Sequence, residues 1–598
     1  MTSPFTLALQ GVTCQLPTGE ILFCDIDESL DERRTGLVGR NGVGKSLLAR
    51  ILAGELAPSA GRCLRQGRVH YLAQHPAGAA SVAELAGVGA PLQALARIEA
   101  GGVDAVDYEL LDGRWDVRQR LEAELTACGL GHLEAETPAA RLSGGEATRV
   151  ALLGAWLSGA DCLILDEPSN HLDRPAREAL HEQLQRWRGG LLLVSHDRLL
   201  LEGMQRILEL SADGLRSYAG GYSAYREAHR LERDGALREL QRRKLERERQ
   251  QRAMQAQRER QEHRQARGRH QARDVNQAAI LVDRQKERSH ASIARLHSQH
   301  GERRERLDDE VREAFARVRQ DAEVLLDAPD CELPAQRGVL VLEGLRLPFG
   351  TCRAPLDLQL CGPRRLAMTG ANGCGKSTLL KVVAGHLAPL AGYCETKVRT
   401  TYLDQHLHSL RADRSVLQSL LERNRRMAPS DLRTRLARMG LGAARIELPM
   451  ALLSGGERVK AALACELYAE QPAQLLLLDE PDNHLDLPAL EALEALLRQY
   501  RGALLVVSHD EAFLAALELD GRLQASAEGW CWAVPSRLYP VAAARSLHRR
   551  RARLLVGASL LANRLRCGAH SRASSLLRRA PPDPPARDSW PWAAEIPA

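Results

Sequence analysis

The stretch Gly39-Arg40-Asn41-Gly42-Val43-Gly44-Lys45-Ser46 matches the pattern GxxxxGKS, and residues Gly370 to Ser377 match it again. Four further motifs follow each copy in the same order: a glutamine, Leu-Ser-Gly-Gly-Glu, an aliphatic run ending in Asp-Glu-Pro, and Ser-His-Asp. From the aspartate of the aliphatic run to the final histidine, the spacing is 30 residues in both copies. One GxxxxGKS alone is only suggestive, whereas five ordered motifs found twice indicate a duplicated domain.

Aliphatic runs that alternate with helical stretches predict the fold of each copy. Leu163 to Leu165 is a short apolar run bounded by acidic and turn residues, as buried strands of a mainly parallel sheet are. Arg174 to Trp187 is typical of a helix. A strand, GxxxxGKS and a helix in that order indicate a P-loop α/β nucleotide-binding fold. We expect two such domains, over residues 1–225 and 333–530.

The segment between the domains, residues 226–332, differs in composition. It is rich in Arg, Gln and Glu and has no proline before Pro329, which favours helix. Since a long polar helix needs a partner, we expect a long α-helical hairpin linker with its turn near Gly268 to Asn276. Residues Gln241 to Arg273 contain 12 basic and 4 acidic residues. This stretch is either a solvated helix face or a surface that contacts nucleic-acid phosphates.

Residues 531–598 form a basic tail outside both repeats. No Asp or Glu occurs from Gly529 through Pro582, although the chain has 76 acidic residues among 598. Two interpretations stay open: a disordered basic tail, and a segment translated out of frame from a GC-rich gene.

Cysteines and hydropathy narrow the class of protein. Thirteen cysteines without CxxC pairs or Cys/His spacing predict neither a structural metal site nor a disulfide framework. Residues Met1 to Glu20 lack a basic start followed by an apolar run, so no secretory signal is expected. No stretch reaches the roughly 18 to 20 apolar residues of a membrane helix. Reduced thiols together with these features predict a cytoplasmic protein.

The residue types of the motifs suit phosphate chemistry. Glycines before GKS leave backbone N–H groups free to surround phosphate oxygens at a helix start. The lysine would then reach the β and γ phosphates, and the serine would hold Mg²⁺. The Asp that ends the aliphatic strand would contact the same ion, and the adjacent Glu would orient the attacking water. In the first and second copy these residues are Lys45 and Lys376, Ser46 and Ser377, Asp166 and Asp479, and Glu167 and Glu480.

A second anion site is predicted at the Leu-Ser-Gly-Gly-Glu motif. A hydroxyl, two glycines and a helix start are found at Ser143-Gly144-Gly145 and again at Ser454-Gly455-Gly456. That composition suits an anion, and it also suits a plain helix N-cap. Nothing within one domain explains why a nucleotide enzyme needs this second site.

Taken together, the motifs resemble the ATP-binding cassette family. The resemblance implies that the signature motif of one domain closes over ATP bound to the phosphate loop of the other. Lys45 would then share a site with Ser454, and Lys376 would share one with Ser143. It also implies that the chain hydrolyses ATP, with ATP and Mg²⁺ as cofactors.

The resemblance implies the following roles. The catalytic residues are Glu167, His196, Glu480 and His509. The Mg²⁺ contacts are Ser46, Gln74, Asp166, Ser377, Gln405 and Asp479. The nucleotide contacts are Gly39, Asn41, Gly42, Gly44, Lys45, Ser46, Gln74, Ser143, Gly144, Gly145, Phe349, Gly370, Asn372, Gly373, Gly375, Lys376, Ser377, Thr378, Gln405, Ser454, Gly455 and Gly456.

Within that family the chain is similar to the ABC-F group. Tandem domains without a membrane span, the sequences Asn-His-Leu-Asp after both Asp-Glu-Pro motifs, and the charged linker carry this resemblance. It implies binding to the ribosome in the ATP-closed state, contact of the linker with tRNA, an effect on translation, and release on hydrolysis. Because the two domains pair within one chain, we expect a monomer. The RNA contacts are expected at Arg242, Arg243, Lys244, Arg264, Arg267, Arg269 and Arg273.

Several residues depart from the group's pattern. Asp482 stands where a Thr or Ser is usual, and Leu47 stands where the second domain has Thr378. Phe349 aligns with an adenine-stacking aromatic, whereas Leu16 is the nearest counterpart in the first domain. We therefore expect weaker or less base-selective binding at the Lys45 site. A longer segment between Gln74 and the signature predicts a short arm insertion at about residues 83–113.

Two other functions fit parts of this pattern. Tandem nucleotide-binding domains also occur as the energising subunit of a transporter with separate membrane proteins, although the linker has no obvious purpose there. A DNA-structure-binding or DNA-repair ATPase could use both basic segments.

Overall fold

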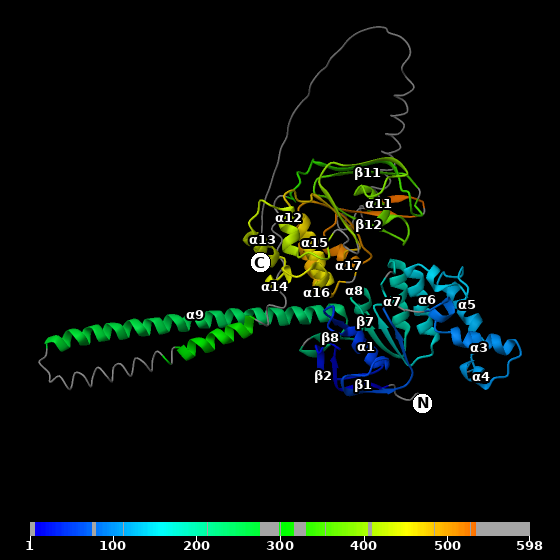
Figure 1. The fold of residues 1–598 in the computed structure, drawn as a ribbon, viewed down its shortest axis with the longest axis horizontal. Coiled ribbons are helices and arrows are strands. Elements are labelled where there is room, and N and C mark those ends of the chain that lie inside the picture. Colours follow the sequence, from blue (N-terminus) through cyan, green and yellow to red (C-terminus); the bar gives the residue numbers. More distant parts are fainter. Residues whose placement is uncertain are drawn as a thin grey trace, which may run out of the picture. The chain divides into compact units, whose positions relative to one another are not determined.

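The computed structural model describes residues 6–74, 79–111, 113–170, 172–211, 213–274, 298, 301–315, 331–352, 354–404, 410–483, 485–526 and 528–533. These residues all belong to one compact unit, Met1–Val534. The basic tail predicted at 531–598 lies almost wholly outside them. We call the part from β1 to β9 domain 1 and the part from β10 to β18 domain 2 (Figure 1).

In the described part of domain 1, one mixed sheet carries the motifs. Its strand order is β5-β6-β7-β3-β8-β9, parallel except for the antiparallel pair β8 and β9. Neighbouring strands such as β6 and β7 are parallel, so a crossover connection must join them, as the α/β prediction required. The strands are β5 (Val69–Leu72), β6 (Cys162–Asp166), β7 (Gly190–Val194), β3 (Arg34–Gly39), β8 (Arg206–Ser211) and β9 (Gly214–Ala219).

Domain 2 repeats this sheet strand for strand. The order β14-β15-β16-β12-β17-β18 has the same parallel core and the same antiparallel edge pair. The repeat predicted from the motifs is therefore a repeat of topology. The strands are β14 (Thr400–Leu403), β15 (Leu475–Asp479), β16 (Ala503–Val507), β12 (Arg365–Gly370), β17 (Gly521–Ala525) and β18 (Trp530–Ala533).

A second, antiparallel sheet accompanies each mixed sheet. The orders are β2-β1-β4 and β11-β10-β13. The strands are β1 (Thr6–Gln15), β2 (Ile21–Leu30), β4 (Ala60–Gln66), β10 (Gly338–Arg346), β11 (Leu356–Cys361) and β13 (Ala391–Thr396). In domain 1 the helix after the phosphate loop, α1 (Lys45–Ala53), packs its Leu48 and Ile51 into one apolar core with both sheets. Because α1 is held on two sides, the loop before it is fixed in place.

The opposite face of the mixed sheet is covered by helices that carry the other motifs. In domain 1, Leu163 and Leu193 of the sheet pack against α6 (Gly144–Leu157), α7 (Arg174–Arg186) and α8 (Arg198–Glu202). Domain 2 has the counterparts α15 (Gly455–Leu467), α16 (Leu487–Gln499) and α17 (Glu511–Ala516), and its phosphate-loop helix is α11 (Lys376–Val383). Strands β6 and β15 are buried throughout, as their continuous aliphatic sequences predicted.

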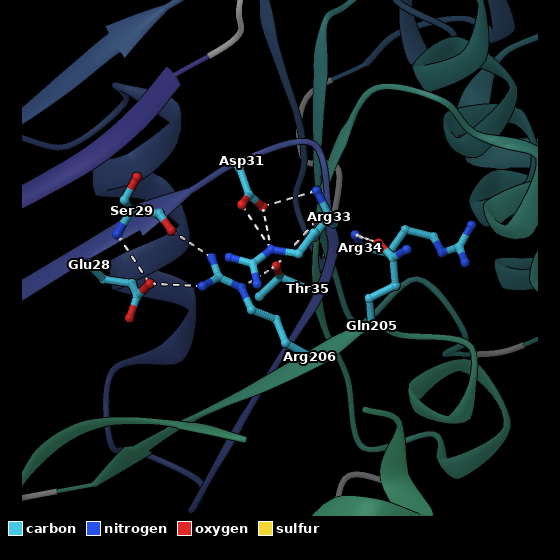
Figure 2. Close-up of polar contacts among 8 residues, drawn as sticks. All are labelled: Glu28, Ser29, Asp31, Arg33, Arg34, Thr35, Gln205 and Arg206. Carbon is cyan, nitrogen blue, oxygen red and sulfur yellow. Dashed lines mark hydrogen bonds and ion pairs between the residues drawn. The ribbon is translucent and has the colours of Figure 1, made fainter. Parts of the chain in front are cut away.

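A buried arginine ties the two sheets of domain 1 together (Figure 2). Arg206 on β8 donates from Nε to Thr35 Oγ1 at 3.0 Å and from Nη1 to Glu28 Oε1 at 3.0 Å. Its Nη2 donates to the Ser29 carbonyl oxygen at 2.6 Å. Since Glu28 and Ser29 belong to β2 and Thr35 to β3, one side chain fixes the antiparallel sheet to the strand that leads into the phosphate loop.

Helices lie between β5 and α6, where domain 1 has the longer sequence. They are α2 (Val82–Leu85), α3 (Gly89–Glu99), α4 (Ala105–Leu111), α5 (Val117–Ala127) and the 3-10 turn η1 (Ala139–Arg141). Domain 2 has α12 (Val416–Arg423), α13 (Pro429–Arg438), α14 (Ala443–Ile446) and η4 (Met450–Leu452). Helix α4 lies beside α3, joined by the bidentate Arg97–Asp107 pair. This helix pair occupies the segment predicted as an arm, and its role as an arm stays a prediction.

A single long helix, α9 (Tyr222–Asp274), leaves domain 1 (Figure 1). Residues 301–315 are helical and lie beside it, because Arg243 Nη1 donates to Glu310 Oε2 at 2.8 Å. Leu240 and Leu307 are both buried, so apolar contacts accompany the ion pairs. The helix continues through Gly268 to Asp274, so most of the stretch predicted as a turn is helical. One glycine costs only about 1 kcal/mol in a helix, and the neighbouring Arg and Gln residues favour helix strongly enough to offset that cost.

Among the described residues, no helix is long and apolar enough to cross a membrane.

Candidate nucleotide-hydrolysis site

Both phosphate loops have a backbone that only glycine adopts readily. Gly42 and Gly44 have φ angles of 83° and 104°, and Gly373 and Gly375 have φ angles of 74° and 108°. At Gly39 a Cβ atom would lie 2.4 Å from the Leu210 carbonyl oxygen. Glycine is therefore required here both for positive φ and for close approach. The loops end at the N-termini of α1 and α11, where N–H groups favour an anion.

The loop lysine occupies the same position in both domains. Lys45 Nζ donates to the carbonyl oxygens of Gly39 at 2.8 Å and Arg40 at 3.1 Å. Lys376 Nζ donates to those of Gly370 at 2.8 Å and Ala371 at 3.0 Å. Burial, as the largest cause, lowers the pKa of Lys45. A phosphate beside this ammonium would favour its charged form, so the lysine is suited to an anionic ligand.

The serine and aspartate predicted to hold Mg²⁺ lie together. Ser377 Oγ donates to Asp479 Oδ1 at 2.9 Å, and the Tyr402 hydroxyl donates to Asp479 Oδ2 at 2.9 Å. In domain 1 the Tyr71 hydroxyl lies 3.3 Å from Asp166 Oδ2. Burial raises the pKa of both aspartates. The hydroxyl and carboxylate donors fit a hard cation. Sequence reasoning missed both tyrosines, which lie one strand away on β5 and β14.

A buried oxygen without a hydrogen-bond partner indicates that these residues fit a cation. Asp166 Oδ1 is buried and has no hydrogen-bond partner. An orphaned carboxylate oxygen beside the phosphate loop is a suitable cation ligand. Among the described residues, no group of three or more His, Cys, Asp or Glu could hold a metal by itself. A cation here would therefore need phosphate or water oxygens as well.

Each glutamate predicted to be catalytic lies near the histidine predicted to act with it. His196 Nε2 lies 3.7 Å from Glu167 Oε1, and His509 Nε2 lies 3.7 Å from Glu480 Oε1. Burial, with Asp166 as an added negative charge, raises the pKa of Glu167 to about 8, and Lys45 opposes this rise. Burial lowers the pKa of His509 to about 4 and that of His196 well below its usual range. Both histidines are thus neutral at pH 7, and each ring can accept one hydrogen bond and donate one.

The backbone at the two glutamates is strained. Glu167 and Glu480 have φ angles of 50° and 49°, which is rare for residues other than glycine. The N–H of Glu167 donates to the Val194 carbonyl at 2.8 Å, and that of Glu480 to the Val507 carbonyl at 2.9 Å. These bonds to the neighbouring strand hold each glutamate at the carboxyl end of the sheet. Strain kept at equivalent positions in both domains is typical of a functional site.

The two domains meet at the phosphate loops. The Asn41 N–H donates to Asp486 Oδ2 at 2.9 Å, and the Asn372 N–H donates to Asp173 Oδ2 at 3.4 Å. Each aspartate ends the Asn-His-Leu-Asp sequence of the opposite domain. Sequence reasoning quoted these sequences without assigning the aspartates a role; their place in both repeats was the available signal.

A cavity of about 520 Å³ surrounds Lys45 and is lined by both domains. Domain 1 contributes several predicted residues, namely Asn41, Gly42, Gly44, Ser46, Gln74, Asp166, Glu167 and His196. Leu16, Leu22 and Leu47 also line it, so its walls hold aliphatic side chains where a base could lie. Domain 2 contributes Asp482, Asn483 and Leu490. The second predicted glutamine, Gln405, lies outside the described residues.

The signature motifs form capped helix starts. Ser143 Oγ accepts from the Glu146 N–H at 3.3 Å, and the Ser143 N–H donates to Glu146 Oε2 at 2.8 Å. Ser454 and Glu457 repeat this capping box. Gly456 has a structural role as well, since a Cβ atom there would lie 2.4 Å from the Ala489 Cβ. Gly144, Gly145 and Gly455 lie in the same two helix starts.

In domain 2 an aromatic residue lies beside the phosphate loop. Phe349 is 65% exposed, and its carbonyl oxygen is 3.3 Å from where a Cβ of Gly375 would lie. The Thr351 N–H donates to the Gly373 carbonyl at 3.1 Å. The ring is thus free to stack on a base bound at Lys376. Thr378 is in the first turn of α11.

Of the predicted RNA contacts, only some have described side chains. Arg242 and Lys244 are exposed, as is Arg267. Arg243 is engaged with Glu239 and Glu310 in the seam between α9 and residues 301–315, so it is a poorer candidate. The side chains of Arg264, Arg269 and Arg273 lie outside the described part.

Comparisons with known proteins agree with this geometry. A family model described as "ABC transporter" matches residues 29–170 and 354–483. The tylosin resistance ATP-binding protein TlrC of Streptomyces fradiae is 32% identical, over 85% of this chain and 95% of that protein. The ribosome protection protein VmlR of Bacillus subtilis (strain 168) is 28% identical, over 80% of this chain and 79% of that protein.

A solved structure shares the fold. It is the archaeal ribosome recycling factor aABCE1, in a complex with the ribosomal stalk protein aP1. The TM-score is 0.52 at 18% identity, over 86% of this chain and 87% of that one. At this identity the likeness concerns only the arrangement of the two domains' elements.

Proposed function

The chain belongs to the ABC-F group of ATP-binding cassette proteins and is an ATPase, and from this premise we propose that it binds the ribosome with ATP bound between its domains and leaves after hydrolysis. The reciprocal contacts of Asp486 with Asn41 and of Asp173 with Asn372 carry the proposal. Each phosphate loop contacts an aspartate of the opposite domain. ATP bound there would hold the two domains together, and hydrolysis would let them separate.

The residues around Lys45 would act in sequence on bound ATP. Lys45 and the loop N–H groups bind the phosphates, and Ser46 and Asp166 would hold Mg²⁺. That ion neutralises phosphate charge when bound. Glu167 orients the attacking water, and neutral His196 contacts the γ phosphate or the water by a hydrogen bond. The Lys376 site has Ser377, Asp479, Glu480 and His509 in the same places.

The partner is proposed from charge and from relatives. VmlR is named a ribosome protection protein, and TlrC a tylosin resistance protein. On α9 the exposed Arg242 and Lys244 lie within the stretch of 12 basic and 4 acidic residues. Such a helix suits the phosphates of rRNA or tRNA, with binding that weakens as salt rises. We propose that a monomer acts on translation in the cytoplasm in this way.

The test uses full-length protein with Glu167→Gln and Glu480→Gln together, which keeps ATP binding and blocks hydrolysis. Sedimented with ribosomes, this variant is expected to comigrate with ATP and to stay at the top of the gradient without it. Lys45→Ala with Lys376→Ala is the control that cannot bind ATP. A trapped variant that binds ATP yet never comigrates would contradict the proposal, and binding to DNA or membranes instead would identify another function.

A second experiment tests the RNA contact. Arg242→Glu with Lys244→Glu should weaken ribosome binding and reduce its salt dependence by about one unit of slope per lost phosphate contact. Arg186→Glu on α7 is the matched control, because Arg186 is 80% exposed but lies on a different element. Equal loss in both variants would contradict the contact at α9.

A further inference from the structure

The two halves of the molecule differ where their domains meet. Ser169 of domain 1 and Asp482 of domain 2 hold equivalent places directly after Asp-Glu-Pro. Arg177 and Leu490 hold equivalent places, as the fourth residues of α7 and α16. One diagonal of the interface thus combines Arg177 with Asp482, and the other combines Leu490 with Ser169. Arg177 and Asp482 carry opposite charges, whereas Leu490 and Ser169 carry none.

Asp482 is a buried carboxylate with one oxygen unused. Its Oδ2 accepts from Ser508 Oγ at 2.9 Å, whereas its Oδ1 is buried with no hydrogen-bond partner. Arg177 and Asp510 are the charged groups that act on it, and both line the Lys45 cavity with it. The negative charge of Asp510 disfavours the ionised form of Asp482, and the positive charge of Arg177 favours it.

Arg177 belongs to domain 1, and two residues of that domain hold its side chain. Its Nε donates to the Leu172 carbonyl at 3.0 Å, and its Nη1 lies 3.6 Å from Asp197 Oδ2. Its charge also acts on Glu480 and His509 of the other site. The guanidinium is therefore placed by domain 1 to act on domain 2.

Asp482 connects the two nucleotide sites through one short segment. Ser508, which donates to Asp482, immediately precedes His509 of the Lys376 site. Asp486, at the other end of the same segment, accepts from the Asn41 N–H at the Lys45 site. A shift of the Ser508–His509 segment would therefore be passed through Asp482 and Asp486 to the loop that holds Lys45.

We propose that Arg177 and Asp482 are positioning residues that make the coupling between the two ATP sites directional, so that ATP at the Lys376 site controls hydrolysis at the Lys45 site more strongly than the reverse. This rests on the two-site ATPase proposed above. The mirror-image path carries Ser169 and Leu490, and neither side chain is charged.

Burial raises the pKa of Asp482 to about 7, with Asp510 adding to the rise and Arg177 opposing it. Arg177 therefore favours the ionised form of this carboxylate. Removing Arg177 alone takes away the positive charge that favours ionised Asp482, whereas removing both residues leaves no such carboxylate.

Two ratios of ATPase rates, measured on the full chain, test the proposal. Ratio A is the rate at the Lys45 site with Glu480→Gln, which keeps ATP at the Lys376 site, divided by the rate with Lys376→Ala. Ratio B is the mirror measurement, with Glu167→Gln and Lys45→Ala. We expect ratio A to exceed ratio B by about fivefold or more, the lower end of usual couplings between sites. Adding Asp482→Ser with Arg177→Leu, which copies the other diagonal, should make the ratios equal.

Asp482→Asn is the second variant, because it keeps the shape and the acceptor for Ser508 while removing the charge. It should lower ratio A as well. Arg186→Leu at the other end of α7 is the matched control and should change neither ratio. Equal ratios in the parent chain, or a ratio A untouched by both Asp482 variants, would overturn the proposal. Loss of ribosome comigration with both ratios intact would overturn only the ribosome-binding function.

Discussion

At the scale of single residues, the two predicted nucleotide sites have the same predicted catalytic residues in different surroundings. Glu167 and Glu480 share a strained backbone and a histidine at 3.7 Å. The two sites differ in the apolar side chains near the phosphate loop. Leu16 and Leu22 line the Lys45 cavity, whereas an exposed Phe349 lies beside the Lys376 loop. We therefore predict the same reaction at both sites but different recognition of the nucleotide base.

The aromatic difference predicts unequal base selectivity. Stacking of a base on an aromatic ring is worth about 1 to 3 kcal/mol by alanine substitution. Phe349→Ala should thus weaken ATP binding at the Lys376 site by roughly 5- to 150-fold, while Leu16→Ala should have a much smaller effect at the Lys45 site. Titration of ATP and GTP into Lys45→Ala and Lys376→Ala variants isolates each site. Equal preference for ATP over GTP at both sites would contradict this.

Asp482 predicts a pH dependence whose sign follows from its raised pKa. The folded protein holds this proton up to a pKa of about 7, whereas an ordinary aspartate loses it near 3.8. Between these values the folded state binds more protons than the unfolded state, so stability falls as pH rises. The loss is at most about 4 kcal/mol. Asp482→Asn should therefore match the parent in thermal unfolding at pH 4, and exceed it at pH 8; parallel curves would count against the buried carboxylate.

At the scale of elements, buried polar contacts decide how sheets and helices are held. The Arg206 network fixes β2 to β3, and β3 leads directly into the phosphate loop. By contrast, the ion pairs along α9 and residues 301–315 are partly exposed, so solvent weakens them. The Arg206 contacts therefore stabilise domain 1, whereas the ion pairs of α9 help to align it with residues 301–315.

Arg206→Met should destabilise domain 1 by about 2 to 4 kcal/mol, since Thr35 and Glu28 lose their donor in a buried place. Arg33→Met is the matched control shown in the same view (Figure 2). Arg33 and Asp31 are each about half exposed, so solvent screens their pair and Arg33→Met should destabilise the protein much less than Arg206→Met. Chemical denaturation of both variants measures the difference. Similar midpoints for the two would show that the Arg206 contacts do not hold the sheets.

The sequence predicted the elements that carry motifs, and it failed where tertiary contacts decide. Strand–loop–helix units at Lys45 and Lys376 follow from local glycine and aliphatic patterns. The helix through Gly268 was missed because local composition suggested a turn while the flanking residues favoured helix. Tyr71, Arg177 and Asp173 could not be placed because their roles depend on a neighbouring strand or on the other domain. Whether residues 83–113 act as an arm stays a prediction.

At the scale of the whole molecule, one buried ion pair links the domains to the start of α9. Arg198 Nη1 lies 2.6 Å from Glu494 Oε1, and the two side chains are only 8% and 5% exposed. The Arg198 guanidinium also lies 5.5 Å from the ring centroid of Tyr222, the first residue of α9. Leu487 of domain 2 packs into the same apolar cluster as Tyr222 and Tyr225. Docking of the domains and the direction of the linker therefore depend on shared side chains.

This predicts that the linker responds when the pair is broken. Glu494→Ala leaves the Arg198 charge buried and unpaired, at a cost of about 3 to 5 kcal/mol to the docked arrangement. Thermal unfolding should then separate into two transitions, and protease should cut near the start of α9 sooner. Arg198→Met with Glu494→Leu replaces the pair by apolar groups of similar size, so a single transition should return. If the double variant behaves like Glu494→Ala, or if Glu494→Ala unfolds as the parent does, the pair does not couple domain docking to the linker.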